Sequence, residues 1–375
     1  MERDDEPYAV FYKVLEYNGI KENEHSKHRK WFTVLEGILL ISLCFDNTFP
    51  LIYVIEDHPF NDKAESLQCV TSMLHISAKV IYYRFRGREK LKRLLDDSVK
   101  IWKEMRNMKK YEDYLDETWL AINKRVNVIT GMFSLCTPIY CLIAFAINLN
   151  LDPEDREPLF KIWDPLKYFF KIEDYFFIRM FYEFMMFSYA LSTIGTLYLI
   201  YLIPSFMAAS QIRFLIKMLS SKDLNVTACI EFHQKVLKYV KDINSLFTVH
   251  MFFEIILATL VITFRSYQLI MIITNYDHGA VVVSYYLILC FMVPLLVCYS
   301  GQMITDASED LFHWTYQNEW YRLNTKDRKS LCIMMTAASI PLSLCYRNTV
   351  TFDMNRYMAV VQATYSYITI LINNN

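Results

Sequence analysis

Long apolar segments, separated by shorter polar ones, dominate the pattern of the chain. They occupy roughly residues 31–55, 66–85, 126–147, 176–204, 247–274, 280–300 and 354–372. A helix that crosses a membrane needs about 20 mostly apolar residues. The pattern therefore predicts an all-α membrane protein with seven transmembrane helices.

The polar segments between these spans are also mostly helical in character. Residues 84–118 carry the densest run of charge, and residues 210–243 are amphipathic and basic. Residues 302–347 are mixed in polarity and contain Pro341, which we expect to break a helix. These segments predict helices that extend out of the membrane.

Composition agrees with a helical membrane protein. The chain of 375 residues is 54% hydrophobic and only 21% charged, with 7 glycines and 10 prolines. A soluble protein would carry about 25% charged residues and about 7% glycine, so a loop-rich or β-rich architecture is disfavoured. The opening MERDDEPYAV is acidic and lacks an apolar core behind a basic start, so we expect no signal peptide and a cytoplasmic N-terminal segment.

The distribution of lysine and arginine predicts the orientation. With the N-terminus inside, the connections expected in the cytoplasm hold 28 of these residues, and those expected outside hold 5. Cytoplasmic loops carry the excess of positive charge, so we expect the C-terminus outside. A G-protein-coupled receptor has the reverse orientation. The glycosylation sequon at Asn225 falls on the cytoplasmic side and is expected to stay unmodified.

Signatures of catalysis are missing from the sequence. The glycines never cluster into a phosphate-binding loop, and neither GxSxG nor HExxH occurs. His25 and His28 are better read as part of a solvated segment than as metal ligands. We therefore predict that the chain is not an enzyme, and we expect no cofactor, no metal and no nucleic-acid partner.

Ionisable residues within the apolar spans stand out, because a charge in hydrocarbon costs at least about 2.5 kcal/mol. They are Lys79, Arg179, Glu183, Glu254 and Arg265. Arg179 and Glu183 are four apart and can pair on one helix. Lys79 indicates that its helix packs within protein. A secondary transporter is disfavoured, since neither internal repeats nor a chain of acidic residues is present.

Aromatic and methionine side chains gather in the outward halves of several spans. An apolar cavity with a few hydroxyls would suit small organic molecules, although ordinary helix packing explains the same residues. The candidate ligand-binding residues from these spans are Phe133, Thr137, Tyr140, Phe181, Phe184, Met185, Ser188, Tyr285 and Tyr286.

The last apolar segment, MAVVQATYSYITILINNN, has a stripe of residues at helical spacing. Ser366, Ile370, and Asn373 or Asn374 fall on one face. If four copies surrounded an axis, Ile370 would form a hydrophobic constriction able to gate by dewetting. A buried packing helix is the competing interpretation.

The C-terminal fifth of the chain resembles a known family, the insect odorant receptors. The residues that carry the resemblance, in the family's order, are CysTyrSerGlyGln at 298–302, Ser308, Tyr316, Trp320-Tyr321, Arg328-Lys329, Pro341 and TyrSerTyr at 365–367. The Lys-Thr pair that the family commonly has before TyrSerTyr is absent here, where Gln362, Ala363 and Thr364 stand instead. The related gustatory receptors are an alternative that the ending of the chain disfavours.

The resemblance implies a tetrameric, ligand-gated, non-selective cation channel in the plasma membrane of a sensory neuron dendrite. It implies binding of small volatile odorants between the second, third, fourth and sixth helices, which adds Met73 and Ile76 to the candidate pocket. The chain lacks the long cytoplasmic insertion of the co-receptor, so it resembles a tuning subunit that assembles with a co-receptor or with itself, surrounded by membrane lipid.

The same resemblance implies a division of the chain. Residues 1–30 would form a cytoplasmic segment, residues 31–301 a six-helix bundle with the outward-facing pocket, residues 302–348 a cytoplasmic anchor region, and residues 349–375 the pore-lining helix. By that likeness Ile370 occupies the narrow gate.

Overall fold

The structure, a computed structural model, describes residues 48–58, 60–153, 163–221, 224–274, 280–317 and 319–373, together with positions 156 and 158. These residues are nearly all helical, which confirms the predicted all-α class. The expected cytoplasmic segment 1–30 and most of the first expected span lie outside the described residues; of that span, residues 48–55 are helical.

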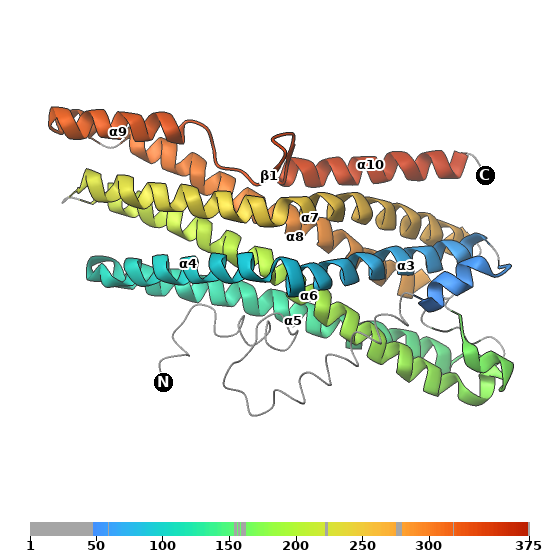
Figure 1. Ribbon diagram of the computed structural model, residues 1–375. Helices are drawn as coiled ribbons and strands as arrows, with labels where there is room; N and C mark the ends of the chain where they lie inside the picture. The colour runs from blue at the N-terminus through green and yellow to red at the C-terminus, as the bar shows by residue number, and fades with distance from the viewer. Residues whose placement is uncertain are drawn as a thin grey trace, which may run out of the picture.

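The main helices are long and run side by side (Figure 1). They are α3 (Phe60–Ile81), α4 (Arg88–Asn107), α5 (Glu112–Leu149), α6 (Ile172–Leu219), α7 (Val226–Thr274), α8 (Ala280–Gln317), α9 (Thr325–Ala338) and α10 (Met354–Asn373). Short connectors complete the described chain: a π-helical turn at Tyr82–Arg86, 3-10 turns at Lys109–Tyr111, Pro165–Tyr168 and Trp320–Arg322, and the strands β1 (Cys345–Tyr346) and β2 (Val350–Thr351).

Several helices are longer than a membrane is thick. The 48 residues of α6 and the 49 of α7 correspond to about 72 Å at 1.5 Å per residue, whereas the hydrocarbon core is about 30 Å. Both helices therefore extend out of the bilayer. The amphipathic segment expected at 210–243 is divided between them, since α6 ends at Leu219 and α7 starts at Val226.

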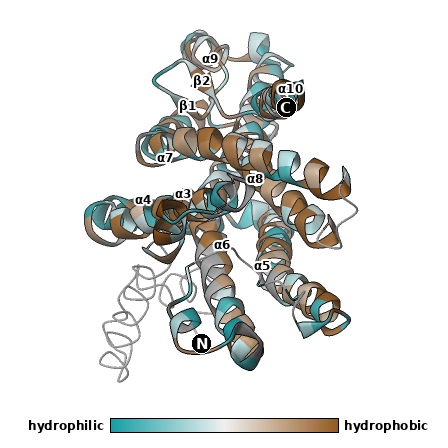
Figure 2. Ribbon diagram, turned by 90° about the vertical axis from the view of Figure 1, so that its right-hand side faces the viewer, coloured by the Kyte–Doolittle hydropathy of each residue, from teal (hydrophilic) through white to brown (hydrophobic). Residues whose placement is uncertain are grey.

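By length and apolarity, four helical segments of the described chain could cross a membrane: Lys109–Leu149, Leu197–Leu219, Val226–Thr274 and Ala280–Gln317. Large apolar side chains remain exposed on helices α5, α6, α7 and α8, among them Leu142, Ile178, Ile256 and Ile288. Apolar residues are brown in Figure 2, where the helices are seen from one end of the bundle. Such a surface suits contact with lipid rather than water.

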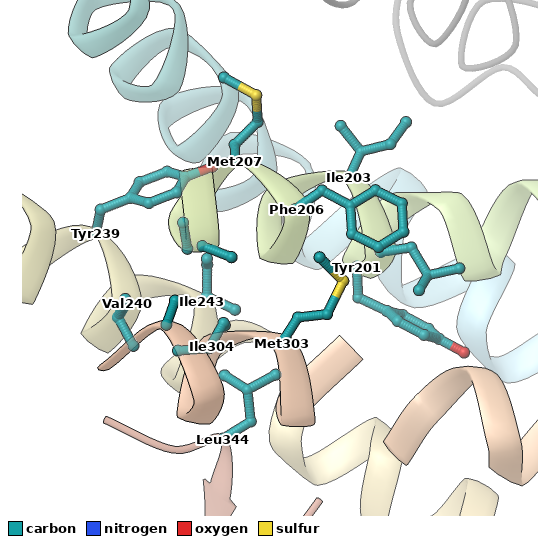
Figure 3. Close-up of a cluster of buried hydrophobic side chains, with 14 of the residues drawn as sticks. Tyr201, Ile203, Phe206, Met207, Tyr239, Val240, Ile243, Met303, Ile304 and Leu344 are labelled. Carbon is teal, nitrogen blue, oxygen red and sulfur yellow. The ribbon is translucent and has the colours of Figure 1, made fainter. Parts of the chain in front are cut away.

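The largest core lies between α6, α7 and α8. Figure 3 shows side chains of these helices meeting there, including Phe206 of α6, Ile243 of α7 and Ile304 of α8, each almost fully buried. Each residue from Leu197 to Ile203 of α6 is at most 3% exposed, so this part of α6 lies at the centre of the bundle.

A two-stranded hairpin connects the last two helices, and the sequence pattern did not predict it. Strands β1 and β2 are antiparallel, with Cys345 opposite Thr351. Arg347 and Asn348, in the turn between them, have positive φ angles of 49° and 56°. Asparagine tolerates this left-handed conformation better than most residues. In Figure 1 the hairpin lies between α9 and α10.

Side chains of α7 and α8 hold the hairpin region in place. Asn244 Oδ1 accepts a hydrogen bond from the Cys345 N–H at 2.9 Å. Ser308 Oγ accepts one from the Leu342 N–H at 2.9 Å. Gln302 Oε1 accepts one from the Met354 N–H at 3.0 Å and so caps the start of α10. Three separate side chains thus fix the chain just before α10.

Gly301 allows α8 and the hairpin to approach closely. A Cβ atom at this position would lie 1.9 Å from the Phe352 carbonyl oxygen. Two residues of the CysTyrSerGlyGln motif, Gly301 and Gln302, therefore act at the same junction. The motif therefore has a structural role, because these two residues hold the beginning of α10 against α8.

We predict that Gly301→Ala lowers the free energy of unfolding of the purified protein by about 1–3 kcal/mol, because the added methyl group overpacks against the backbone. Thermal unfolding in detergent measures this change. Gly131→Ala is the matched control, since a Cβ at Gly131 meets nothing within 4 Å; alanine there should be neutral or stabilising by up to about 1 kcal/mol. Equal unfolding temperatures for the two variants would contradict the prediction.

Candidate functional site

A partly open cavity of about 130 Å³ lies between the helices of the bundle. Its walls come from α3, α5, α6, α7 and α8 and are mostly apolar. The lining residues are Ser72, His75, Ile76, Lys79, Met132, Phe133, Cys136, Leu191, Ile194, Leu197, Tyr198, Glu254, Leu257, Ala258, Val261, Tyr286, Leu289, Cys290, Met292 and Val293.

Four polar residues of this lining form one connected cluster: His75, Lys79, Tyr198 and Glu254. Lys79 Nζ makes an ion pair with Glu254 Oε2, and His75 Nε2 lies 3.3 Å from the same oxygen. The Tyr198 hydroxyl donates to the other oxygen of Glu254. The Lys79 ammonium also lies 5.5 Å from the centroid of the Tyr198 ring. The cluster therefore ties α3, α6 and α7 together beside the cavity.

Local helix geometry explains how the cluster forms. His75 and Lys79 are four residues apart in α3, so they share one face of the helix. Only 3% of Lys79 and 5% of Glu254 is exposed, which confirms the prediction that the helix carrying Lys79 packs within protein. In such surroundings a charge needs a partner, and each residue supplies the charge that the other lacks.

A second buried ion pair joins the same two helices. Arg265 Nη1 of α7 lies 3.6 Å from Glu65 Oε1 of α3. Gln268 bridges them, accepting from Arg265 at 2.7 Å and donating to Glu65 at 2.9 Å. The guanidinium also lies 4.7 Å from the centroid of the Tyr286 ring, which lines the cavity.

The two pairs have complementary positions along their helices. In α3 the acid Glu65 precedes the base Lys79, and in α7 the acid Glu254 precedes the base Arg265. Because each acid faces the base of the other helix, this order pairs the charges only when α3 and α7 run antiparallel. The two spacings, 14 and 11 residues, are close to whole numbers of turns at 3.6 residues per turn.

A third cluster lies near the beginning of α6. Arg179 Nε donates to Glu183 Oε1 at 2.9 Å, which confirms the predicted pair within this helix. Arg179 Nη1 also contacts Asp164 Oδ2 at 3.0 Å, and Tyr175 donates to that oxygen at 2.9 Å. These contacts bind the loop before α6 to the helix.

In the nearby connections, Lys167 Nζ lies 2.9 Å from Glu56 Oε2. A hydrogen bond from Lys167 lowers the pKa of the Glu56 carboxyl most, and one from His58 lowers it further. The Lys167–Glu56 ion pair therefore holds the segment that follows the helical residues 48–55 to the loop before α6.

The candidate pocket residues fall into three groups. Ile76, Phe133 and Tyr286 line the cavity. Tyr140 and Tyr285 lie beside it: the Tyr140 ring is 6.2 Å from that of Tyr286, and the Tyr285 hydroxyl donates to the Cys136 carbonyl at 3.2 Å.

The third group lies away from the cavity lining. Phe181 and Met185 are 65% and 53% exposed on α6, Phe184 and Ser188 are half-buried there, and Met73 packs against the main core. The Thr137 side chain lies outside what the structure describes. The cavity's α6 residues, Leu191 to Tyr198, follow the aromatic-rich segment 177–189 along the helix, and its α8 residues, Tyr286 to Val293, lie in the first half of α8.

Sequence reasoning did not place Ser72, His75, Lys79, Tyr198 or Glu254 in a pocket. The charged residues Lys79 and Glu254 had been recognised as unusual within apolar spans. That signal could have found the polar end of the cavity, because a buried charge needs a partner on another helix. Which helix supplies the partner depends on the packing.

Helix α10 packs against α7 and α8 along one narrow face. Its buried residues within the described part of the helix are Val360 and Thr364. At 3.6 residues per turn, Ser366, Ile370 and Asn373 lie about 180–240° around the helix from Thr364. All three are exposed, with Ile370 54% exposed. Asn374 lies outside the described residues.

A comparison with protein-family models decides the family. The model described as 7tm Odorant receptor matches residues 60–365, which is most of the chain. The chain belongs to the odorant receptor family. It is thus a multi-pass membrane protein of a receptor family and not an enzyme.

Curated relatives agree with this assignment. Odorant receptor 10 of Aedes albopictus is 24% identical over 149 residues, and odorant receptor 85b of Drosophila melanogaster is 23% identical over 146 residues. The matched regions cover 40% and 38% of this chain, and 39% and 36% of the relatives. The chain therefore matches less than half the length of these receptors in sequence.

Solved structures show the fold over nearly the whole chain. The insect olfactory receptor OR5 from Machilis hrabei, in complex with eugenol, superposes with a TM-score of 0.78 at 12% identity. The match covers 98% of this chain and 97% of that receptor. A second structure of the same receptor superposes with a TM-score of 0.77 at 13% identity. The arrangement of helices is shared although few residues are.

We predict that Lys79→Met alone lowers the stability by about 3–5 kcal/mol, because it leaves the Glu254 carboxylate buried without its cation. Combining it with Glu254→Gln should recover most of that loss. Thermal unfolding of the purified protein measures both. The control is Lys235→Met: Lys235 pairs with Glu104 on the surface, with side chains 45% and 42% exposed, so its loss should cost no more than about 1 kcal/mol. A Lys79 variant as stable as the Lys235 variant would contradict this assignment.

Proposed function

We propose that this chain is the odorant-binding subunit of a ligand-gated, non-selective cation channel. The observation that carries the proposal is the mainly apolar cavity between the helices of a fold shared with an olfactory receptor. An apolar cavity of about 150 Å³ can hold one benzene molecule, so the volume of about 130 Å³ suits a small volatile compound.

The proposed location is the plasma membrane of a sensory neuron dendrite, with the N-terminus in the cytoplasm and the C-terminus outside. The excess of lysine and arginine in the expected cytoplasmic connections, 28 against 5, supports this orientation. The proposed assembly is a heterotetramer with an odorant co-receptor, or a homotetramer, embedded in membrane lipid.

In this proposal α10 lines the pore, with Ser366, Ile370, Asn373 and Asn374 facing the axis. The described residues of this set point away from the subunit's own bundle, as a pore-facing surface must. Tyr365 and Ile372 on the flanks are also exposed, so α10 has free surface for neighbouring copies as well. Four Ile370 side chains would form the constriction that gates by dewetting.

The division into domains is part of the same proposal: a cytoplasmic segment 1–30, a bundle 31–301, an anchor region 302–348 and a pore helix 349–375. Support for the anchor comes from large apolar side chains exposed beyond the bundle. Tyr316, Tyr321, Ile333 and Ile340 are 56–77% exposed in the single chain. Apolar surface on an extramembrane region indicates contact with another protein, which we propose is the neighbouring subunit.

Helix α8 offers a route from the cavity to the pore. Val293 lines the cavity, and Gly301 and Gln302, about two turns further along, hold the beginning of α10. A ligand that binds better when α8 takes the position of the open channel would shift the population towards opening. We propose that odorants act through this helix.

The first test is whole-cell current in cells that express the chain with and without an insect odorant co-receptor, under a broad panel of volatiles. We expect a fast inward cation current that persists when G-protein signalling is blocked. A response that requires G-protein signalling, or silence to the whole panel despite surface expression with the co-receptor, would count against the proposal.

We predict that Ile370→Ser raises the current at rest, because a hydroxyl in the constriction favours wetting of the pore. The same recordings without ligand measure it. Ile372→Ser is the matched control: Ile372 is 45% exposed but lies on the flank of α10, about 160° around the helix from Ile370. Equal resting currents in both variants would contradict the assignment of Ile370 as the gate.

A further inference from the structure

We infer that the cavity selects neutral ligands that carry a hydrogen-bond acceptor oxygen, such as a ketone, ester or ether, and that Lys79 binds that oxygen. The inference rests on the proposed function and narrows its ligand class. It is based on the arrangement of the cavity: most of the walls are apolar, and the polar cluster around Lys79 and Glu254 lies at one end.

Both carboxylate oxygens of the cluster are already engaged. Glu254 supplies its carboxylate oxygens, and they face Lys79, His75 and the Tyr198 hydroxyl. An ammonium group carries three donors and no acceptor. The ion pair with Glu254 engages Lys79 once, so this side chain keeps capacity to donate towards the cavity that it lines. A ligand oxygen can accept such a hydrogen bond.

Position along the helix directs these groups to the cavity. Ser72, His75 and Lys79 follow each other at three- and four-residue spacing in α3, so they form one stripe, and all three line the cavity. The opposite walls are apolar, with residues such as Leu191, Leu289 and Val293. A ligand with one polar end and one apolar body therefore has a single favoured orientation.

Charge balance favours a neutral ligand. The cluster holds one ammonium and one carboxylate that compensate each other, and both are more than nine-tenths buried. An ionised ligand would bring a further charge into the interior without a counter-charge, at a large desolvation cost. A hydrocarbon would place no acceptor against the donors of Lys79, and a buried donor without an acceptor is unfavourable.

The test compares two ligands of nearly the same shape, acetophenone and ethylbenzene, which differ in the carbonyl group. Their dissociation constants are measured on the purified full chain in nanodiscs, from the dependence of thermal stability on ligand concentration. A hydrogen bond to a charged group is worth at least about a tenfold change in affinity. We expect acetophenone to bind at least about tenfold more tightly than ethylbenzene.

The variant that tests the role of Lys79 is the double substitution Lys79→Met with Glu254→Gln, which removes both charges of the pair. It should bind both compounds within about twofold of each other, because the donor that distinguishes them is gone. The control variant is Glu65→Gln with Arg265→Met, a buried pair between the same helices whose residues do not line the cavity. It should keep the preference for acetophenone.

A direct measurement does not depend on any variant. The carbonyl stretch of acetophenone bound to the wild-type chain should lie at lower frequency than in an apolar solvent, because a hydrogen bond weakens the C=O bond. An unshifted carbonyl, equal affinities in the wild type, or a preference that survives in the double variant would each overturn the inference. Tighter binding of benzoate or of 1-phenylethylammonium than of acetophenone would overturn the choice of a neutral ligand.

The outcomes also separate this inference from the proposed channel function. Selective binding of acetophenone without any current in cells would overturn the channel and leave the selectivity standing. Odorant-gated currents with no dependence on an acceptor oxygen would overturn the selectivity and leave the channel standing.

Discussion

The arrangement of the bundle depends on the pairing of charges between α3 and α7. Two acids and two bases lie inside apolar helices, where each would be costly alone, and each finds its partner on the other helix. This pairing fixes the direction and the register of α3 against α7. It also places polar groups beside the cavity, so the contact that aligns the helices defines one end of the candidate ligand site.

Packing differs along the molecule. Between the cavity and the hairpin, α6, α7 and α8 form a continuous core that reaches the hairpin through Leu344, shown in Figure 3. Towards the other end a separate cluster forms between α5, α6 and α8, with Tyr140 and Phe187 in contact. The cavity lies between these two regions.

The connection between α8 and α10 shows why short motifs can be informative. Gly301 and Gln302 stand next to each other in the sequence, yet they act on Phe352 and Met354, about fifty residues later. The glycine leaves room for a backbone carbonyl and the glutamine caps the following helix. A family motif of this kind reports a close contact between distant segments, although the sequence alone does not say which segments meet.

The sequence by itself determined the all-helical class, the approximate positions of the apolar segments and the pairing of Arg179 with Glu183, because these follow from apolar periodicity and from contacts within one helix. It also marked Lys79 and Glu254 as residues that need partners. Only the tertiary structure decided that they pair with each other, that the cavity lies beside them, and that Phe181 and Met185 point away from it. Partners on different helices are chosen by packing and by register, and a one-dimensional pattern contains neither.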